Sequence, residues 1–259
     1  MSLEDVLRAV AEGQLSVAEA ADQLRLNQVT EVGAAAKLDL FREHRTGVPE
    51  CVLAEGKSTK QVLDIVSAAL AQKEFVLVTR CNGEVAERLG GIDGAEAERD
   101  DEARLVLVKR SGSHVPISGG RIGVLTAGTS DIPAAREAQR VAELMGCAAV
   151  FEADVGVAGL QRLFPALSRV LETKPDVLVV AAGREGTLPA VVAGLAPVPV
   201  IGLPVSTGYG KGGAGEAALT SMLQSCSPMV VVNIDAGFVA GAVAAQFANA
   251  VARARTDRA

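Results

Sequence analysis

The sequence predicts an α/β protein in which a C-terminal doubly wound parallel sheet, arranged as three α/β/α layers, follows a smaller N-terminal α/β domain and a helical arm. From Arg121 onward, five short and continuously apolar segments alternate with amphipathic helical stretches, as is typical of a parallel sheet covered on both faces. The hydrophobic content of 49% and the charged content of 22% are those of a globular chain with a large core. A chain of 259 residues is long enough for two domains.

Residues 1–33 predict the helical arm. Ser2 and Ser16 occupy N-cap positions, Ser16 and Glu19 match a capping box, and Gly13 ends the first helix. The apolar residues of this helix recur at helical spacing, so one face needs a partner. The arm serves either as an oligomer contact or as a plain N-terminal cap.

Residues 34–112 predict the small α/β domain. Strands are expected at 50–54, 75–79 and 104–108, because these runs are apolar and rich in β-branched residues. A helix is expected from Ser58 to about Gln72, and Ser58 with Gln61 again matches a capping box. Gly, Ser and Pro gather between 109 and 120, which we interpret as the linker.

Residues 120–259 predict the larger domain, in which strands and helices alternate. The strands are expected at 121–127, 148–153, 176–182, 198–204 and 229–235, and the helices at 132–145, 157–173, 187–195, 214–225 and 238–253. Ligands of such sheets bind beyond the carboxyl ends of the strands. The loops that follow the strands are therefore the places to search for chemistry.

Composition and charge exclude several classes of protein. A formal net charge of −6 and an aromatic content of 3% leave neither a basic surface nor a stacking platform for nucleic acid. The longest apolar runs have the length of strands, so no membrane segment is expected. Four cysteines without a C-x-x-C pair favour reduced thiols and a cytoplasmic location.

The loop after the first strand of the larger domain, "AGTSDIP" at 127–133, has two interpretations. Gly128 frees the backbone, Ser130 and Asp131 suit the cap of the next helix, and Pro133 suits its first turn. A helix N-terminus with a nearby hydroxyl is also a natural seat for phosphate. This loop alone leaves plain capping and phosphate binding equally open.

The loop after the third strand, "AAGREGTLPA" at 181–190, places two charged residues at the expected ligand edge. Arg184 suits a bidentate clamp on phosphate or carboxylate, and Glu185 suits an acid, a base or a metal ligand. The alternative is a solvated surface pair without a role in chemistry.

The loop after the fourth strand is rich in glycine. Gly208, Gly210 and Gly213 match G-x-G-x-x-G, which taken literally is the dinucleotide fingerprint of a dehydrogenase. Its first glycine, however, stands too far from the preceding strand for the tight turn that the fingerprint needs. The pattern instead favours a mobile flap that closes over an anion, with Tyr209 inside it and Lys211 at its tip.

Cys226 stands between Ser225, Ser227 and Pro228, at the end of a predicted helix. A free cysteine is more often a buried core residue than a nucleophile, and we interpret Cys51, Cys81 and Cys147 as core residues. A helix C-terminus disfavours a thiolate, so that activation has to come from a cation. The residues by themselves leave both interpretations of Cys226 open.

Taken together, these loops resemble a known family. "TAGTSD", "AAGREGTLP", "PVIGLPVSTGYG" and "SMLQSCSP…VVNIDAGF" resemble the pyridinium-3,5-biscarboxylic acid mononucleotide synthases of nickel-pincer nucleotide biosynthesis, and "REHRTGVPECVLAEGK" resembles their N-terminal domain. The C-terminal half is also similar to carboxyaminoimidazole ribonucleotide mutases. Thr187, however, stands where a mutase carries its catalytic histidine, and the two histidines of the chain, His44 and His114, lie elsewhere.

The resemblance implies a reaction and a set of site residues. Nicotinic acid adenine dinucleotide, carbon dioxide or bicarbonate, and water would give the dicarboxylated mononucleotide and AMP, with Cys226 as nucleophile and Glu185 and Asp131 as catalytic carboxylates. Mg²⁺, held by Asp154 and Asp235, is the expected cofactor, without an organic cofactor. The expected assembly is a homo-oligomer, an octamer. The residues expected to bind the substrate are Gly128, Ser130, Arg184, Gly208, Tyr209, Gly210 and Lys211, with Arg45, Thr46, Lys57 and Arg80 of the first domain.

Some positions depart from the family pattern. Met229 replaces a common glycine, "DAGFV" replaces an expected Asp-Asn-Gly-Phe-Gly, and His44 and Val48 are atypical. The segment after the cysteine is therefore expected to pack differently. Two alternatives remain open besides the mutase: a dehydrogenase that uses the glycine pattern, and a nucleotide sensor without catalysis.

Overall fold

A computed structural model of the chain describes residues 3–26, 29–32, 36–39 and 42–257. The chain divides into an N-terminal unit, Met1–Arg99 with Val106–Ser113, and a C-terminal unit, Asp100–Leu105 with His114–Ala259. Ser2, the expected first N-cap, lies outside the described residues. Among the described residues, none of the helices has the combination of length and apolar character that a membrane crossing requires.

Two short helices open the N-terminal unit, α1 (Leu3–Ala11) and α2 (Val17–Leu26). The capping box expected at Ser16 is confirmed: its backbone N–H donates to Glu19 Oε2 at 2.9 Å, and the Glu19 N–H donates back to Ser16 Oγ at 3.2 Å. Gly13 has a φ of +72°, the left-handed conformation that ends a helix.

The rest of the N-terminal unit is a hairpin and a four-stranded sheet. The sheet has the order β3-β4-β6-β5, with β3 parallel and β6 antiparallel to β4. The capping box of Ser58 and Gln61 is confirmed at the start of α4. The hairpin, α3, α5 and β5 are elements that the sequence analysis did not predict. The bounds are β1 (Val29–Val32), β2 (Ala36–Asp39), α3 (Arg42–Thr46), β3 (Cys51–Leu53), α4 (Thr59–Leu70), β4 (Phe75–Thr79), α5 (Gly83–Leu89), β5 (Ala95–Asp100) and β6 (Leu105–Arg110).

The C-terminal unit is built on a five-stranded sheet in the order β11-β10-β9-β7-β8, and each of its pairings is parallel. The predicted doubly wound α/β fold is therefore confirmed. The bounds are β7 (Arg121–Thr126), η1 (Thr129–Asp131), α6 (Ile132–Leu144), β8 (Ala148–Glu152), η2 (Val157–Gly159), α7 (Leu160–Glu172), β9 (Val177–Ala182), α8 (Thr187–Leu195), β10 (Val200–Pro204), α9 (Glu216–Leu223), β11 (Val230–Val231) and α10 (Gly237–Thr256).

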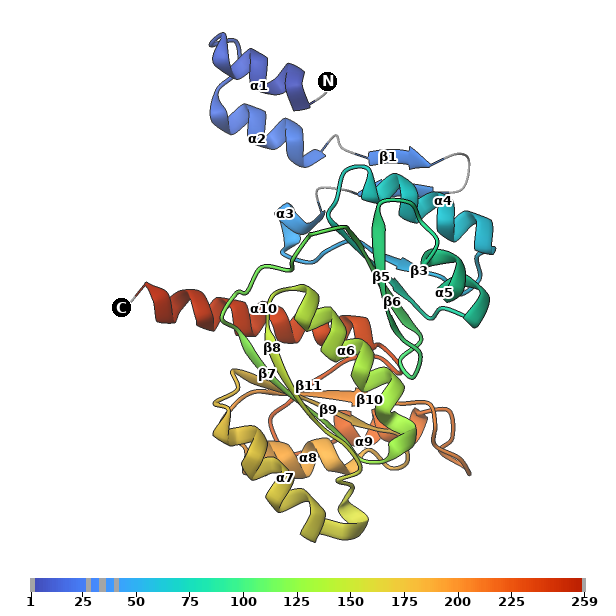
Figure 1. Cartoon of the computed structure of the whole chain (residues 1–259). Coiled ribbons are helices and arrows are strands. Elements are labelled where there is room, and N and C mark those ends of the chain that lie inside the picture. The colour runs from blue at the N-terminus through green and yellow to red at the C-terminus, as the bar shows by residue number, and fades with distance from the viewer. Residues whose placement is uncertain (1–2, 27–28, 33–35, 40–41, 258–259) are drawn as a thin grey trace. The chain divides into compact units, whose positions relative to one another are not determined.

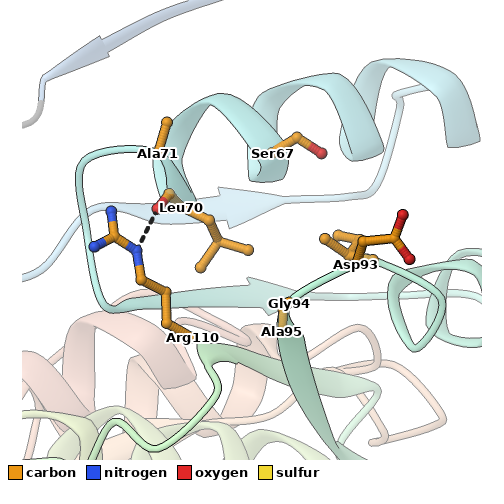
Figure 2. A pocket seen from close by; sticks show the side chains of 8 residues that line it. Ser67, Leu70, Ala71, Asp93, Gly94, Ala95 and Arg110 are labelled. Atoms are coloured by element: carbon orange, nitrogen blue, oxygen red, sulfur yellow. Dashed lines mark hydrogen bonds between the residues drawn. The ribbon is translucent and has the colours of Figure 1, made fainter.

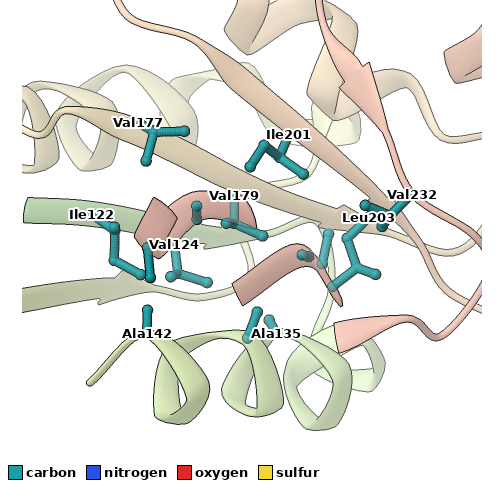
Figure 3. Close-up of a cluster of buried hydrophobic side chains, with 14 of the residues drawn as sticks. Ile122, Val124, Ala135, Ala142, Val177, Val179, Ile201, Leu203 and Val232 are labelled. Atoms are coloured by element: carbon teal, nitrogen blue, oxygen red, sulfur yellow. The ribbon is translucent and has the colours of Figure 1, made fainter. Parts of the chain in front are cut away.

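Two apolar clusters hold the layers of the C-terminal unit together. Helices α6 and α10 cover one face of the sheet, and α7, α8 and α9 cover the other (Figure 1). In the first cluster, Ala135 and Ala142 of α6 face Ile122, Val124 and the neighbouring strands (Figure 3). Small alanines on these helices allow a close approach to the sheet.

Several expected elements are shorter than predicted, and for two of them the backbone shows the cause. The strand expected at 229–235 is reduced to Val230–Val231, because Asn233 turns the chain with a side-chain hydrogen bond to the N–H of Ile234. The helix expected from 214 begins only at Glu216. Ala214 and Gly215 have φ values of +55° and +81°, which a right-handed helix cannot contain.

Candidate active site

The carboxylate of Asp131 joins three loops at the carboxyl edge of the sheet. Its Oδ2 accepts from the N–H of Gly128 at 2.8 Å, and its Oδ1 accepts from Thr207 Oγ1 at 3.0 Å. The N–H of Gly183 donates to the same carboxylate. Asp131 is only 4% exposed, so this side chain is a buried acceptor shared by the loops after β7, β9 and β10.

Gly183 is the residue that lets these loops meet. A Cβ placed on it would overlap Thr207 Oγ1 and would lie 2.9 Å from Asp131 Oδ1. The carbonyl of Gly183 in turn lies 2.8 Å from the position that a Cβ of Gly208 would take. The loops after β9 and β10 can therefore approach this closely only because residues 183 and 208 are glycines, which have no side chain.

The environment of Asp131 makes its carboxyl group a stronger base than an ordinary aspartate. Burial raises the pKa of Asp131, and the charge of Glu185 raises it further, whereas the hydrogen bonds from Gly128, Thr207 and Gly183 lower it. The rise prevails. The expected capping role differs from this arrangement: Asp131 stands at the N-cap of α6, but its side chain makes no cap bond to that helix.

Arg184 and Glu185 are exposed on the loop after β9. The Arg184 guanidinium carbon lies 4.0 Å from the centre of the Tyr209 ring, which connects this loop to the glycine-rich loop after β10. Ser130, in the short turn η1, is exposed as well. These groups surround Asp131 with exposed polar and charged side chains at one edge of the sheet.

The glycine-rich loop is not a dinucleotide fingerprint. The chain leaves β10 at Pro204 and enters α9 only at Glu216, so no tight strand-to-helix turn exists there. The N–H of Ala214 donates to Gly208 O at 3.3 Å, and the N–H of Gly213 donates to Gly210 O at 3.1 Å. The loop is a hydrogen-bonded flap with Lys211 exposed near its tip.

Asp154 and Asp235, the expected metal ligands, do not come together. Asp154 follows β8 and its Oδ2 accepts from Arg162 Nη1 at 2.5 Å, whereas Asp235 follows β11 and its Oδ1 accepts from the Ser206 N–H at 2.9 Å. These strands are opposite edges of the sheet, about 19 Å apart at the usual strand spacing. Within the described ranges, no three His, Cys, Asp or Glu side chains form a group that could hold a metal ion. These residues do not fit the expected Mg²⁺ site.

The four residues of the N-terminal unit that are expected to bind substrate lie in two pairs at opposite ends of the strands. Arg80 forms an ion pair with Glu55 at 3.0 Å, and Lys57 Nζ donates to Leu53 O at 2.7 Å, so both lie at the carboxyl ends of β3 and β4. Arg45 and Thr46 belong to α3, which precedes β3; Glu43 of this helix pairs with Lys73 just before β4.

The Arg45 guanidinium donates to Asp39 at 2.5 Å, and Thr46 Oγ1 donates to Arg42 O at 2.7 Å. These two residues therefore lie at the opposite edge of the small sheet from Lys57 and Arg80.

The N-terminal unit also contains a pocket of about 460 Å³ between the end of α4 and the start of β5 (Figure 2). Arg110 Nε donates to Leu70 O at 2.7 Å beside it and so caps the carbonyl end of α4. The lining is mostly apolar, with Asp93 and Ser67 at its rim and no further charged residue besides Arg110.

Cys226 is exposed but lies at the amino edge of the large sheet, where the strands begin, and Asp131 lies at the carboxyl edge, where they end. It precedes β11, and the register pairs Val230 of that strand with Ile201, near the start of β10. The adjacent Ser227 lies against the end of α8, where a Cβ on Gly194 would be 3.9 Å from Ser227 Oγ. Helix α8 runs from the carboxyl edge to the amino edge, so within one chain Cys226 and Asp131 lie on opposite sides.

The other cysteines differ from Cys226 in exposure. Cys81 and Cys147 are buried and Cys51 is half-buried. Burial raises the pKa of the Cys147 thiol, whose Sγ lies 3.2 Å from Asn249 Oδ1. These positions agree with core roles.

Two members of the Asp131 cluster, Gly183 and Thr207, are not among the site residues predicted from the sequence. Gly183 follows the buried strand β9 directly, and Thr207 stands just before the glycines of the flap, so both belong to candidate loops. A glycine at the first position after a parallel strand is a usable signal of close backbone approach. The pairing with Asp131, in contrast, has no counterpart in the sequence.

The two units of the chain match two different families of known domains. Residues 29–110 match the LarB/PurE-like N-terminal domain, and residues 121–258 match AIR carboxylase. An uncharacterized protein of Methanocaldococcus jannaschii is 39% identical over 250 residues, which cover 94% of this chain and 95% of that protein. An N5-carboxyaminoimidazole ribonucleotide mutase of Pyrococcus horikoshii is 28% identical over 116 residues, 44% of this chain and 64% of that protein.

Proposed function

Because the chain belongs to the AIR carboxylase family and carries a LarB/PurE-like N-terminal domain, we propose that it carboxylates the pyridinium ring of nicotinic acid adenine dinucleotide and releases AMP. The family makes the chain an enzyme of carboxylase or mutase type. The substrate, the covalent cysteine step and the release of AMP are the proposal. The product would be pyridinium-3,5-biscarboxylic acid mononucleotide.

The observation that carries the proposal is the exposure of Cys226. All four cysteines lie within the described residues, and of these Cys226 is exposed, whereas Cys51 is half-buried and Cys81 and Cys147 are buried. A cysteine kept for packing alone would be buried.

The proposed chemistry uses the thiolate to reverse the polarity of the ring. The sulfur forms a bond to C4 of the pyridinium, and the ring becomes a neutral dihydropyridine whose C5 is enamine-like. C5 then forms a bond to the carbon of CO₂, a base removes the proton from C5, and the C4–S bond breaks to restore the aromatic cation. No oxidant or reductant is needed, and one proton is released.

In the expected homo-oligomer, Asp131 and Glu185 of a neighbouring copy are the groups suited to accept that proton, because within one chain they lie at the edge of the sheet opposite to Cys226. The raised pKa of Asp131 favours proton uptake, while Glu185 is exposed and adds negative charge at the same edge. Negative charge also favours a cationic ring over a neutral one, so the two carboxylates help to bind the pyridinium. Arg184 lies beside them and suits the carboxylate of the substrate.

Release of AMP requires water to attack the phosphoanhydride of the dinucleotide. The exposed Lys211 and the backbone N–H groups of the glycine flap suit the negative charge of the two phosphates. Asp154 and Asp235 do not come together within one chain, and this step is therefore derived without a metal ion. The water adds to one phosphorus, and the other phosphate leaves with the nucleoside to which it is attached.

Thr187 distinguishes this proposal from a mutase activity. The residue begins α8, directly after Gly186 at the ligand edge, where the imidazole of a mutase would stand. A threonine hydroxyl does not take up a proton near neutral pH, so the proton shuttle of a mutase has no carrier there. The synthase reaction does not require an imidazole at this position.

The test is incubation of the protein with nicotinic acid adenine dinucleotide and ¹⁴C-bicarbonate. We expect an acid-stable labelled dicarboxylate and AMP, which chromatography and mass spectrometry identify. Cys226→Ala should lose the carboxylation, and the matched variant Cys147→Ala should retain it as long as it remains folded. Carboxylation by Cys226→Ala at the parent rate would exclude the covalent mechanism, and conversion of N5-carboxyaminoimidazole ribonucleotide instead would favour the mutase.

A further inference from the structure

We propose that the pocket of the N-terminal unit binds a small monocarboxylate with an apolar body, at a site that the proposed carboxylation does not use. The pocket lies between the end of α4 and the start of β5 and has a volume of about 460 Å³ (Figure 2). Small-molecule sites have volumes of about 300–1,000 Å³. The pocket is therefore large enough for a ligand of this class, and the inference does not depend on the proposed function.

The floor of the pocket suits an apolar ligand body. Leu70 is 7% exposed and belongs to the apolar core of this unit, and Ile92 and Ala95 are half-buried against the same core. The side chain of Leu70 lies between Arg110 and Asp93 (Figure 2). A ligand that covers these apolar side chains removes their surface from water, and this burial would supply part of the binding free energy.

Arg110 supplies a fixed cation at one end of the pocket. Its Nε donates to Leu70 O at 2.7 Å, and its backbone N–H donates to Glu74 O at 2.9 Å, so the residue is held from two sides. Within the described part of the chain, the guanidinium of Arg110 has no carboxylate partner. Its Nη atoms carry further N–H donors, which match the two oxygens of a ligand carboxylate.

Asp93 limits the charge that the ligand can carry. It is exposed at the opposite end of the pocket, and Ser67 is the other polar side chain of the rim. Like charges repel, so a second anionic group beside Asp93 is disfavoured, whereas a hydroxyl or an amine can donate to this carboxylate. A cation at one end and an anion at the other therefore favour a monocarboxylate whose far end carries a hydrogen-bond donor.

The same charges disfavour the dinucleotide of the proposed reaction. Its two phosphates and its carboxylate need several cations, but among the described residues that line the pocket Arg110 is the one positively charged side chain. The pocket also lies at the amino edge of the small sheet, because α4 begins after β3 and ends before β4. Lys57 and Arg80, which are expected to bind substrate, lie at the carboxyl ends of β3 and β4. The pocket is therefore a second site within this unit.

The test measures the binding of 3-(4-hydroxyphenyl)propionate, which has a carboxylate, an apolar ring and a hydroxyl at the far end. Saturation-transfer difference NMR of the full-length protein follows the ring protons of this probe over a titration. We expect saturable binding to the parent at millimolar concentrations. The uncharged amide of the probe should bind about tenfold more weakly, because it loses the charged hydrogen bonds to Arg110.

Two variants locate the site. Arg110→Gln should weaken the binding of the carboxylate about tenfold, to the level of the amide. Ser67→Phe keeps Arg110 and fills the pocket from its rim, so it should abolish binding. The matched control is Arg88→Gln: Arg88 is an exposed arginine near the end of α5 and outside the lining, and its replacement should leave the affinity unchanged. Circular dichroism checks that each variant is folded.

Three outcomes would each overturn the inference: equal affinities for the carboxylate and the amide, unchanged binding by folded Ser67→Phe, and no saturable binding by the parent. If one variant does not fold, the comparison of the carboxylate with the amide and the other variant still decide. Carboxylation of the dinucleotide is a separate measurement, in which Arg110→Gln should have the parent rate. Failure of either proposal therefore leaves the other intact.

Discussion

Thr207 Oγ1 donates a hydrogen bond of 3.0 Å to Asp131 Oδ1, although the two residues are 76 positions apart in the chain. This bond ties the flap after β10 to the loop after β7, and Gly183 lies directly against both partners. The carboxyl edge of the sheet therefore has one buried centre on which three loops depend.

Replacement of Gly183 by alanine should disrupt the hydrogen bond between Thr207 and Asp131. The new Cβ would overlap Thr207 Oγ1 and crowd Asp131, so the side chains have to move apart. We expect a loss of about 1–3 kcal/mol in the free energy of unfolding, as for other overpacked sites, with loss of activity. Urea denaturation followed by circular dichroism measures the change.

The matched control for Gly183→Ala is Gly83→Ala in the first turn of α5. A Cβ at Gly83 meets no atom within 4 Å, and alanine favours the helix, so stability should be unchanged or slightly higher. Equal effects of the two substitutions would contradict the close packing described for Gly183.

The stability of the protein should depend on pH through Asp131. Because the pKa of Asp131 is raised in the folded state, its contribution to stability is fully present below the ordinary value of 3.8 and is lost as the pH rises through the folded value. Asp131→Asn does not titrate. The difference in the free energy of unfolding between the parent and this variant should therefore be most favourable to the parent at the lowest pH and decline as the pH rises.

A second variant identifies the origin of this pH dependence. The hydrogen bond from Thr207 lowers the pKa of Asp131, so Thr207→Val should move the decline to higher pH. Urea unfolding over a series of pH values gives the curves. Parallel curves for the parent and Asp131→Asn over the whole range would show that this carboxyl group does not titrate abnormally.

The contact between Arg184 and Tyr209 should report the binding of anions. The chain has one tyrosine and no tryptophan, so its intrinsic emission comes from Tyr209 alone. An anion that pairs with Arg184 competes with a ring contact of about 0.5–1 kcal/mol, and titration with inorganic pyrophosphate should change the emission.

Arg184→Ala should abolish this response, whereas Arg162→Ala, whose partner is Asp154 rather than a ring, should preserve it. Tyrosine fluorescence measured over the titration gives both results. A response of the same size in Arg184→Ala would mean that the anion does not act through the guanidinium.

Much of the fold could be predicted from the sequence. The capping boxes at Ser16 and Ser58 depend on residues three positions apart, and the buried strands β4, β7 and β9 are runs of adjacent apolar residues. The short helices α3 and α5 and strand β5 were missed. Their sequences are polar, and β5 (Ala95–Asp100) pairs at the edge of its sheet, where a buried face is not required.

The candidate site was predicted only in part. Asp131, Arg184, Glu185 and the flap glycines stand in loops that follow strands, and the parallel sheet brings these loops to one edge. Asp154 and Asp235, the predicted metal ligands, are far apart within one chain, because the strands that they follow, β8 and β11, are the two outer strands of the sheet. The order of the strands along the chain does not reveal which strands are neighbours in the sheet.

The sequence by itself determined the alternation of strands and helices, the loops that carry polar side chains and the family, because these properties reside in neighbouring residues. Only the tertiary structure decided that Thr207 and Gly183 meet at Asp131 and that Cys226 lies at the opposite edge. The strands pair in parallel, so all of them run in the same direction across the sheet. Residues that follow a strand therefore lie at the carboxyl edge, and residues that precede a strand lie at the amino edge.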